Sequence, residues 1–281
     1  PEGWQVLLDE NGYNLVNLRD KRYDAVIHLV TAADGAEEFY SLENNVARYE
    51  STKELAIQTD RKIRDAWVGH PLLVIADNHQ GSFDKKIMKV YETVLHVVGL
   101  PNAPKFYRKF LLNKDYKCVD GIPVIPETYQ TETVLMEDTF LRSHDPKLER
   151  KLRKRGLKDS FIYIYSTTQY NKPRDEMTDK DFENDGVECK RQITAREYIL
   201  LFEEKDPKRK TLEKVRQSFV YEGELFCIDT FLDGKNSFSL LNIEATKDLA
   251  GIKMPSFISI EKDVTDKLEY TTYNVARIEK Q

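Results

Sequence analysis

The stretch Leu148–Arg155 (LERKLRKR) decides how the second part of this chain is expected to fold. In a β-strand, alternate side chains share one face, so Lys151, Arg153 and Arg155 would point the same way. Taken alone, the stretch is typical of a solvent-exposed edge strand that its charge keeps from aggregating. The alternative is a strand that lines a cationic cavity.

The same spacing of basic residues recurs in other strand-like segments, which favours the cavity. Arginine can contact two phosphate oxygens at once, and lysine supplies a mobile point charge, so the two together suit several phosphates in a row. We therefore predict a site for a phosphate-rich ligand, formed by Lys105, Lys109, Lys151, Arg153, Arg155, Lys190, Lys214 and Arg216.

Three acidic residues in strand-like segments are candidate metal ligands. Glu188, Asp229 and Glu244 could hold Mg²⁺ or Mn²⁺ against phosphate oxygens if the fold brings them together. The alternative for each is a surface charge or an ion pair with a neighbouring lysine or arginine.

Beyond Pro104 the pattern predicts antiparallel β structure with occasional helices. The predicted strands are 106–112, 131–141, 148–155, 161–168, 187–193, 212–221, 224–231, 237–244 and 257–264. The stretches YEGE at 221–224 and LDGK at 232–235 carry turn signals between consecutive strands, as hairpins require. Thr194 and Glu197 have capping-box spacing and predict a short helix.

The first hundred residues follow a different pattern. Apolar runs at 23–30 and 72–77 flank a helical pattern at 51–67, which predicts a β-α-β unit with parallel strands; Ser82 is expected to cap a further helix. Two parallel strands are too few for a doubly wound domain, so we expect a preceding piece to be absent. The predicted division is an α/β part at 1–103 and an α+β part at 104–281.

Composition excludes several functional classes. The chain has 281 residues, of which 40% are hydrophobic and 32% charged, and its formal charge is −5. A net acidic chain is not expected to bind nucleic acid generally. Cys118, Cys189 and Cys227 are widely spaced and favour neither disulfides nor zinc, which suits a reducing cytoplasmic setting. No apolar run approaches the length of a membrane span.

Two smaller predictions concern ring side chains. His28 lies in an apolar run and is predicted to be a satisfied core residue rather than a ligand. Tyr163 and Tyr165 alternate on a strand and are predicted to pack in the core or the cavity wall. The alternative for them is a hydroxyl contact with phosphate.

Ordered motifs in the second part resemble the CYTH, or triphosphate tunnel, fold over roughly 104–277. They are RKFLL at 108–112, the basic strand ending at Arg155-Gly156, ECKRQITAREY at 188–198, KVR at 214–216, FCIDTF at 226–231 and LNIE at 241–244. The resemblance implies an eight-stranded antiparallel tunnel that binds triphosphate-containing or other phosphate-rich ligands. Some members of that family hydrolyse these ligands with Mg²⁺ or Mn²⁺.

The chain departs from the enzymes of that family at their acidic motifs. Lys105, Tyr107 and Lys109 stand where those enzymes have E-x-E-x-K, and Asn242 replaces one glutamate of L-E-x-E. Fewer carboxylates hold hard metal ions less well, so we expect binding rather than hydrolysis.

The first part resembles the second half of a P-loop ATPase or kinase-like domain, in the segments 23–34, 43–50, 60–67, 69–71 and 76–78. Paired with a CYTH-like part, it is similar to the TRPL translocation defect protein family. That resemblance implies binding of guanine nucleotide and phosphoinositide, a role in membrane-protein trafficking, and cytoplasmic location with peripheral membrane contact.

The chain contains no G-x-x-x-x-G-K-[ST], so GTP binding would need a P-loop that these residues lack. With it, Arg48 and Arg64 could reach phosphates, and Asp77 and Asn78 could contact the base. Alternatively, the arginines are solvated helix charges and Asp77-Asn78 is only a turn.

Three functions compete at this stage. The leading one is a regulatory protein that binds a phosphate-rich ligand without catalysis. The others are a metal-dependent triphosphatase of the CYTH type and a P-loop NTPase or small-molecule kinase.

Overall fold

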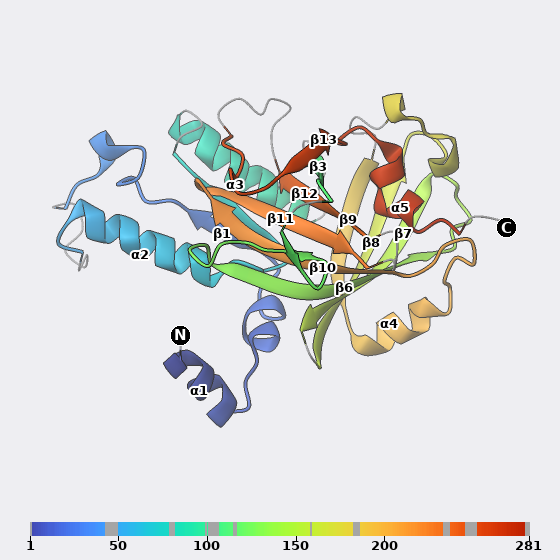
Figure 1. Cartoon of the computed structure of the whole chain (residues 1–281), viewed down its shortest axis with the longest axis horizontal. Coiled ribbons are helices and arrows are strands. Elements are labelled where there is room, and N and C mark those ends of the chain that lie inside the picture. The colour runs from blue at the N-terminus through green and yellow to red at the C-terminus, as the bar shows by residue number, and fades with distance from the viewer. Residues whose placement is uncertain are drawn as a thin grey trace.

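The computed structural model describes residues 2–42, 50–78, 82–98, 100, 107–114, 117–157, 159–181, 186–232, 237–244 and 252–278. A large twisted antiparallel sheet dominates the molecule, and the helices of the first hundred residues lie towards one end of it (Figure 1). The mixed α and β architecture agrees with the predicted fold class.

The main sheet has nine strands in the order β13-β3-β12-β11-β10-β6-β7-β8-β9, and every neighbouring pair is antiparallel. Their bounds are β3 Tyr107–Leu112, β6 Thr131–Leu141, β7 Leu148–Leu157, β8 Ser160–Tyr170, β9 Gly186–Ile193, β10 Leu212–Tyr221, β11 Glu224–Phe231, β12 Phe238–Glu244 and β13 Ile260–Asp263. The nine predicted strands are confirmed, and β13 is shorter than predicted. The implied eight-stranded tunnel is not shown, because the sheet has nine strands and its end strands β9 and β13 do not pair among the described residues.

Strand β7 is not an edge strand, since it pairs with β6 on one side and β8 on the other. One of its faces packs in a core formed with α4 (Ala195–Phe202), where Leu152 is fully buried beside Tyr198. The predicted capping box of α4 is confirmed: Thr194 accepts from the Glu197 backbone and Glu197 reaches back to Thr194. The charge of Leu148–Arg155 therefore has a role other than protecting an edge.

Strands β10 and β11 form the predicted hairpin at Tyr221–Glu224. Its two turn residues, Glu222 and Gly223, have φ of 50° and 88°, which is the left-handed region that such tight turns require. Next to the turn, Phe219 and Phe226 stack in the largest apolar cluster of the sheet.

The first hundred residues form the predicted β-α-β unit. It contains α1 (Glu2–Glu10), η1 (Val16–Asp20), β1 (Val26–Leu29), η2 (Glu37–Phe39), α2 (Lys53–Ala66), β2 (Leu73–Ala76) and α3 (Phe83–Val97), with β1 and β2 parallel. Helix α2 is capped by Thr52, whose side chain accepts from the Leu55 backbone N–H. Ser82 precedes α3 but makes no capping hydrogen bond through its side chain.

Short elements complete the described chain. They are the hairpin of β4 (Cys118–Val119) and β5 (Ile122–Pro123), the 3-10 turns η3 (Arg174–Glu176), η4 (Asp179–Asp181) and η6 (Leu268–Tyr270), and α5 (Thr272–Val275). No helix in the described ranges combines the length and apolarity needed to cross a membrane.

The β-α-β unit packs directly on the main sheet. Leu73 and Ile75 of β2 share an apolar cluster with Val220 and Leu225 of the β10–β11 hairpin. Arg19 donates to Glu132 across 3.3 Å, which links the unit to β6. The predicted boundary at residue 104 lies outside the described residues and stays a prediction.

His28 lies on β1 and is 8% exposed, with its Nε2 atom 3.1 Å from an Asp60 carboxylate oxygen. The prediction of a satisfied core histidine is confirmed.

Candidate functional site

A cavity of about 850 Å³ lies along the concave face of the main sheet. Residues of eight consecutive strands, from β3 to β9 in sheet order, line it. The structure brings together there every predicted phosphate-binding cation that it describes: Lys109, Lys151, Arg153, Arg155, Lys190, Lys214 and Arg216. Lys105 lies outside the described residues.

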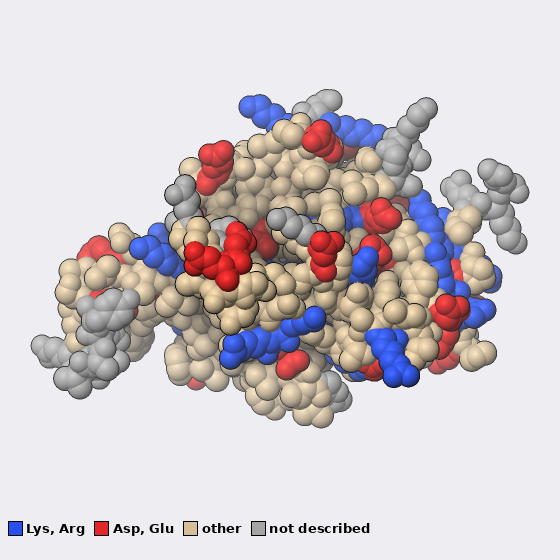
Figure 2. Space-filling model, turned by 90° about the horizontal axis from the view of Figure 1, so that it is seen from below, with Lys and Arg blue, Asp and Glu red and all other residues tan. Residues whose placement is uncertain are grey.

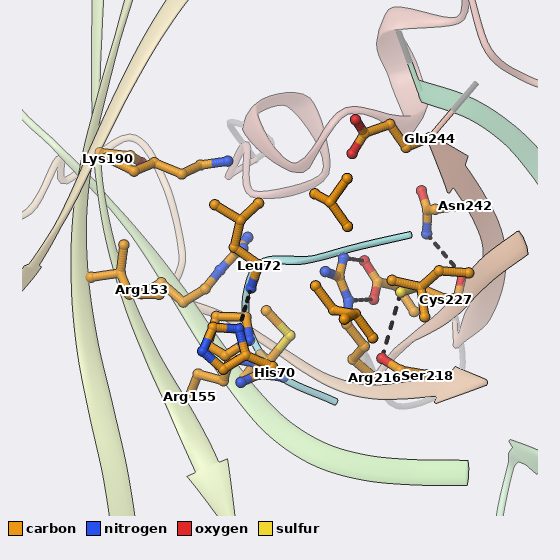
Figure 3. A pocket seen from close by; sticks show the side chains of 18 of the residues that line it. His70, Leu72, Arg153, Arg155, Lys190, Arg216, Ser218, Cys227, Asn242 and Glu244 are labelled. Atoms are coloured by element: carbon orange, nitrogen blue, oxygen red, sulfur yellow. Dashed lines mark hydrogen bonds and ion pairs between the residues drawn. The ribbon is translucent and has the colours of Figure 1, made fainter. Parts of the chain in front are cut away.

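The β-α-β unit supplies the opposite wall of the cavity. Leu72 and His70 lie between Arg153 on one side and Arg216 on the other (Figure 3). The Leu72 backbone N–H donates to His70 Nδ1 at 3.1 Å, so Nε2 carries the proton and donates to the Tyr23 carbonyl at 3.0 Å. Burial lowers the pKa of His70, which keeps the ring neutral. No pattern in the sequence indicates that this segment faces the charged strands.

Five charged side chains form a continuous chain of ion pairs across the cavity floor. Arg153 donates to both oxygens of Asp138, at 2.6 and 2.8 Å. Lys214 Nζ lies 3.4 Å from Asp138 and 3.0 Å from Asp229. Arg216 in turn donates to both oxygens of Asp229, at 2.6 and 2.7 Å. The ion chain Arg153–Asp138–Lys214–Asp229–Arg216 therefore crosses four strands, β7, β6, β10 and β11.

The two carboxylates of this ion chain are held in their charged form. Burial alone would raise the pKa of Asp138 and Asp229, but the adjacent cations outweigh it and hold both pKa values well below the usual range. Asp138 is fully buried, and Lys214 is 2% exposed. Sequence reasoning missed Asp138, although its register partner on β7 is Arg153.

The other cavity cations differ in how they are held. Arg155 donates to Asp20 at 3.2 Å and to the Gly69 carbonyl, so it ties the β-α-β unit to the sheet. Burial lowers the pKa of Arg155 to about 10. Burial and the nearby Lys214 lower the pKa of Lys109 to about 8. Lys190 pairs with Glu188 at 2.6 Å.

The three predicted metal ligands also line this cavity, from β9, β11 and β12. Two of them are already engaged, because Asp229 accepts from Arg216 and Lys214, and Glu188 accepts from Lys190. Among the described residues, no group of three acidic, histidine or cysteine side chains is placed to hold a metal ion. The residues present do not fit the divalent metal that the family resemblance implies.

The predicted nucleotide contacts lie elsewhere. Arg64 pairs with its neighbour Asp65, and Asn78 donates to the carbonyls of Thr31 and Asp34 and accepts from Lys86. None of Arg64, Asp77 and Asn78 lines the cavity, and Arg48 lies outside the described residues.

Tyr163 and Tyr165 do not line the cavity either. Tyr163 packs on Tyr198 of α4, and the Tyr165 hydroxyl accepts from Arg150 at 2.9 Å. Both are therefore on the sheet face that α4 covers.

The outer surface has no comparable concentration of cations on the face shown in Figure 2, where basic and acidic side chains are interspersed. A mixed surface gives little long-range attraction for polyanions. The basic residues singled out in the sequence thus gather inside the cavity.

Comparisons with known proteins found distant structural likeness. No protein-family model and no curated protein matches the chain. The inorganic triphosphatase NE1496 is 19% identical, with a TM-score of 0.39 over 62% of this chain and 95% of that one. PH1819 from Pyrococcus horikoshii is 14% identical, with a TM-score of 0.36 over 51% and 80%.

HpAC1 from Hippeastrum, described as having a dominant triphosphatase activity, is 12% identical, with a TM-score of 0.33 over 51% of this chain and 80% of that one. At these TM-scores the likeness assigns neither a family nor an activity to the chain. The two predicted resemblances, one to the TRPL translocation defect family and one to the second half of a P-loop domain, stay predictions.

Proposed function

We propose that the cavity binds a phosphate-rich anion, such as a linear polyphosphate, through fixed lysine and arginine side chains and without a divalent metal. The observation that supports this most is the ion chain Arg153–Asp138–Lys214–Asp229–Arg216. Lys214 lies between two carboxylates on the cavity floor, and these carboxylates act against the lowering of its pKa by burial.

Preorganised cations in a partly enclosed cavity favour anion binding for two reasons. Their side chains are already ordered, so binding costs less conformational entropy. The surroundings are less polar than water, which strengthens the attraction. Cations outnumber carboxylates along the cavity, so a net positive field remains for the ligand.

The same ion pairs favour binding without hydrolysis. A carboxylate that accepts from two cations has few free lone pairs with which to hold a metal ion or activate water. Asp229 is in this state, since Arg216 and Lys214 take both of its oxygens.

A metal-dependent triphosphatase is the second candidate. It is supported by the location of Glu188, Asp229 and Glu244 in one cavity. This function needs the acids to leave their lysine and arginine partners and to turn towards a metal–phosphate complex.

The family resemblance adds more specific ligands and roles to this proposal. A phosphoinositide head group is one candidate ligand, because its phosphates offer the chemistry that the cavity recognises. GTP binding, peripheral membrane contact, membrane-protein trafficking and a P-loop kinase or NTPase activity rest on the resemblance alone.

Calorimetric titration with tripolyphosphate in EDTA tests the proposal. We expect binding that weakens as salt is raised. Phosphate release is followed in parallel with Mg²⁺ or Mn²⁺. Absence of binding in EDTA, together with release in the presence of metal, would favour the triphosphatase.

A further inference from the structure

One row of side chains in the cavity combines two ammonium groups with a hydroxyl. Lys151 on β7 is the register partner of Ser166 on β8, and Ser166 is the register partner of Lys190 on β9. All three line the cavity. Residues directly opposite in antiparallel strands have Cβ atoms about 5 Å apart, so the three groups can reach one small anion.

Two members of this row have no partner. Among the described residues, Lys151 makes no hydrogen bond or ion pair, in contrast to the fixed cations of the ion chain. The Ser166 hydroxyl has no hydrogen-bond partner in the same part of the chain, although the residue is only 4% exposed. Both groups line the cavity, so they are available to a ligand there.

The third member is held by a single acid. Lys190 pairs with Glu188, and burial lowers the pKa of Lys190 while Glu188 acts against that change. Burial would raise the pKa of Glu188, but Lys190 and Lys151 outweigh it and lower it to about 2. Glu188 is thus an anion that competes with any ligand for Lys190, and the row keeps a net positive charge.

The chemistry of this row suits the end of a phosphate chain. A terminal phosphate has three free oxygens and up to two negative charges, whereas an internal or cyclic phosphate has two free oxygens and one charge. Two ammonium donors and one hydroxyl donor match the terminal group.

We propose that Lys151, Ser166 and Lys190 form a terminal-phosphate subsite, so that the cavity selects linear polyphosphates and phosphate monoesters over cyclic or fully esterified phosphates. This proposal rests on the proposed function and assigns selectivity to one part of the site. Ser166 is the new element, because its hydroxyl contributes a directional donor and no charge.

The experiment compares linear tripolyphosphate with cyclic trimetaphosphate by calorimetry in EDTA, using wild type, Lys151→Met, Ser166→Ala and Lys154→Met. Lys154 is the matched control, since it lies on the same strand but pairs with Glu137 outside the cavity. Thermal unfolding of each variant checks that it is folded.

Wild type is expected to prefer tripolyphosphate. Lys151→Met removes a charge-assisted hydrogen bond and is expected to weaken tripolyphosphate affinity by about tenfold or more. Ser166→Ala removes a neutral hydrogen bond and is expected to weaken the same affinity by roughly threefold to tenfold. Ser166→Ala should leave trimetaphosphate binding unchanged, and Lys154→Met should leave both ligands unchanged.

Equal losses for both ligands in Ser166→Ala, or no loss, would overturn the subsite while leaving polyphosphate binding intact. If wild type binds neither ligand in EDTA, the proposed function itself fails. The two failures are therefore distinguishable.

Discussion

The guanidinium of Arg153 contacts the fully buried carboxylate of Asp138 at two points, Nε to Oδ1 at 2.6 Å and Nη2 to Oδ2 at 2.8 Å. Lys214 approaches the same carboxylate from the neighbouring strand. Asp138 thus fixes two of the cations on the cavity floor, and without it both would lie close together with no charge between them.

Asp138→Asn is expected to reduce the free energy of unfolding by about 3–5 kcal/mol, because it leaves Arg153 without its counter-charge and removes one of the two carboxylates beside the buried Lys214. Denaturant titration measures this, with Glu137→Gln as the control. Glu137 is the sequence neighbour whose pair with Lys154 lies at the surface, and exposed pairs contribute about 0–1 kcal/mol. Tripolyphosphate should restore part of the loss by supplying negative charge. A loss below about 1 kcal/mol for Asp138→Asn would contradict the role of the ion chain.

The stability contribution of Asp138 should depend on pH in one direction. Its pKa is lowered by folding from an ordinary value of 3.8, so the contribution is present above that pH and is lost as pH falls below it. The difference in unfolding free energy between wild type and Asp138→Asn is therefore expected to shrink below about pH 4. A difference that grows on acidification would show that the carboxyl group is not held in its charged form.

Glu188→Gln separates the two candidate functions. If Glu188 competes with the ligand for Lys190, its removal should tighten tripolyphosphate binding in EDTA by roughly threefold or more. If it holds a metal, its removal should weaken binding or phosphate release in Mg²⁺ or Mn²⁺. Glu213→Gln is the control, since Glu213 is exposed and is not among the residues that line the cavity.

The lowered pKa of Lys109 predicts how ligand affinity changes with pH. Its lowered pKa of about 8 means that the side chain loses its charge as pH rises through that value, and an anion binds the charged form better. Affinity for tripolyphosphate is expected to fall between pH 7 and pH 9 in wild type, relative to Lys109→Arg, which stays charged. The ligand titrates equally in both samples, so the comparison isolates Lys109. Parallel profiles for the two proteins would contradict the assignment.

Substitution of Gly69 by alanine tests how tightly the β-α-β unit is packed on the sheet. Its φ is +93°, and an added Cβ would lie 2.2 Å from Glu132 Cγ. Gly223 has φ +88° with open space around the same position, so Gly223→Ala carries the backbone strain alone. We expect Gly69→Ala to reduce the free energy of unfolding by about 1–3 kcal/mol more than Gly223→Ala. An equal loss of unfolding free energy in the two variants, measured by chemical denaturation, would mean that the Glu132 side chain moves aside at little cost.

The strands of the main sheet could be predicted because their side chains alternate with period two. Predicted and observed bounds coincide for β6, β10 and β11, whose residues are rich in aromatic and β-branched types. Alternation also placed Lys151, Arg153 and Arg155 on one face, and all three line the cavity.

The features of the structure that were not predicted depend on contacts between residues far apart in the sequence. Arg155 meets Asp20, which is 135 positions away in the sequence, and no local pattern marks that pair. The cavity wall formed by His70 and Leu72 has the same origin. Closure of the sheet was implied by the resemblance alone, and the pairing of β9 and β13 that it needs does not occur among the described residues.

The most direct test of metal-free binding in the cavity uses the natural cysteines. Cys227 lines the cavity beside Ser218, whereas Cys118 and Cys189 are exposed and are not among the lining residues. Alkylation by iodoacetamide in EDTA is followed for each cysteine by peptide mass spectrometry, with and without tripolyphosphate. We predict that tripolyphosphate slows the reaction of Cys227 and leaves Cys118 and Cys189 unchanged. Equal rates at Cys227 with and without saturating tripolyphosphate would contradict binding in this cavity.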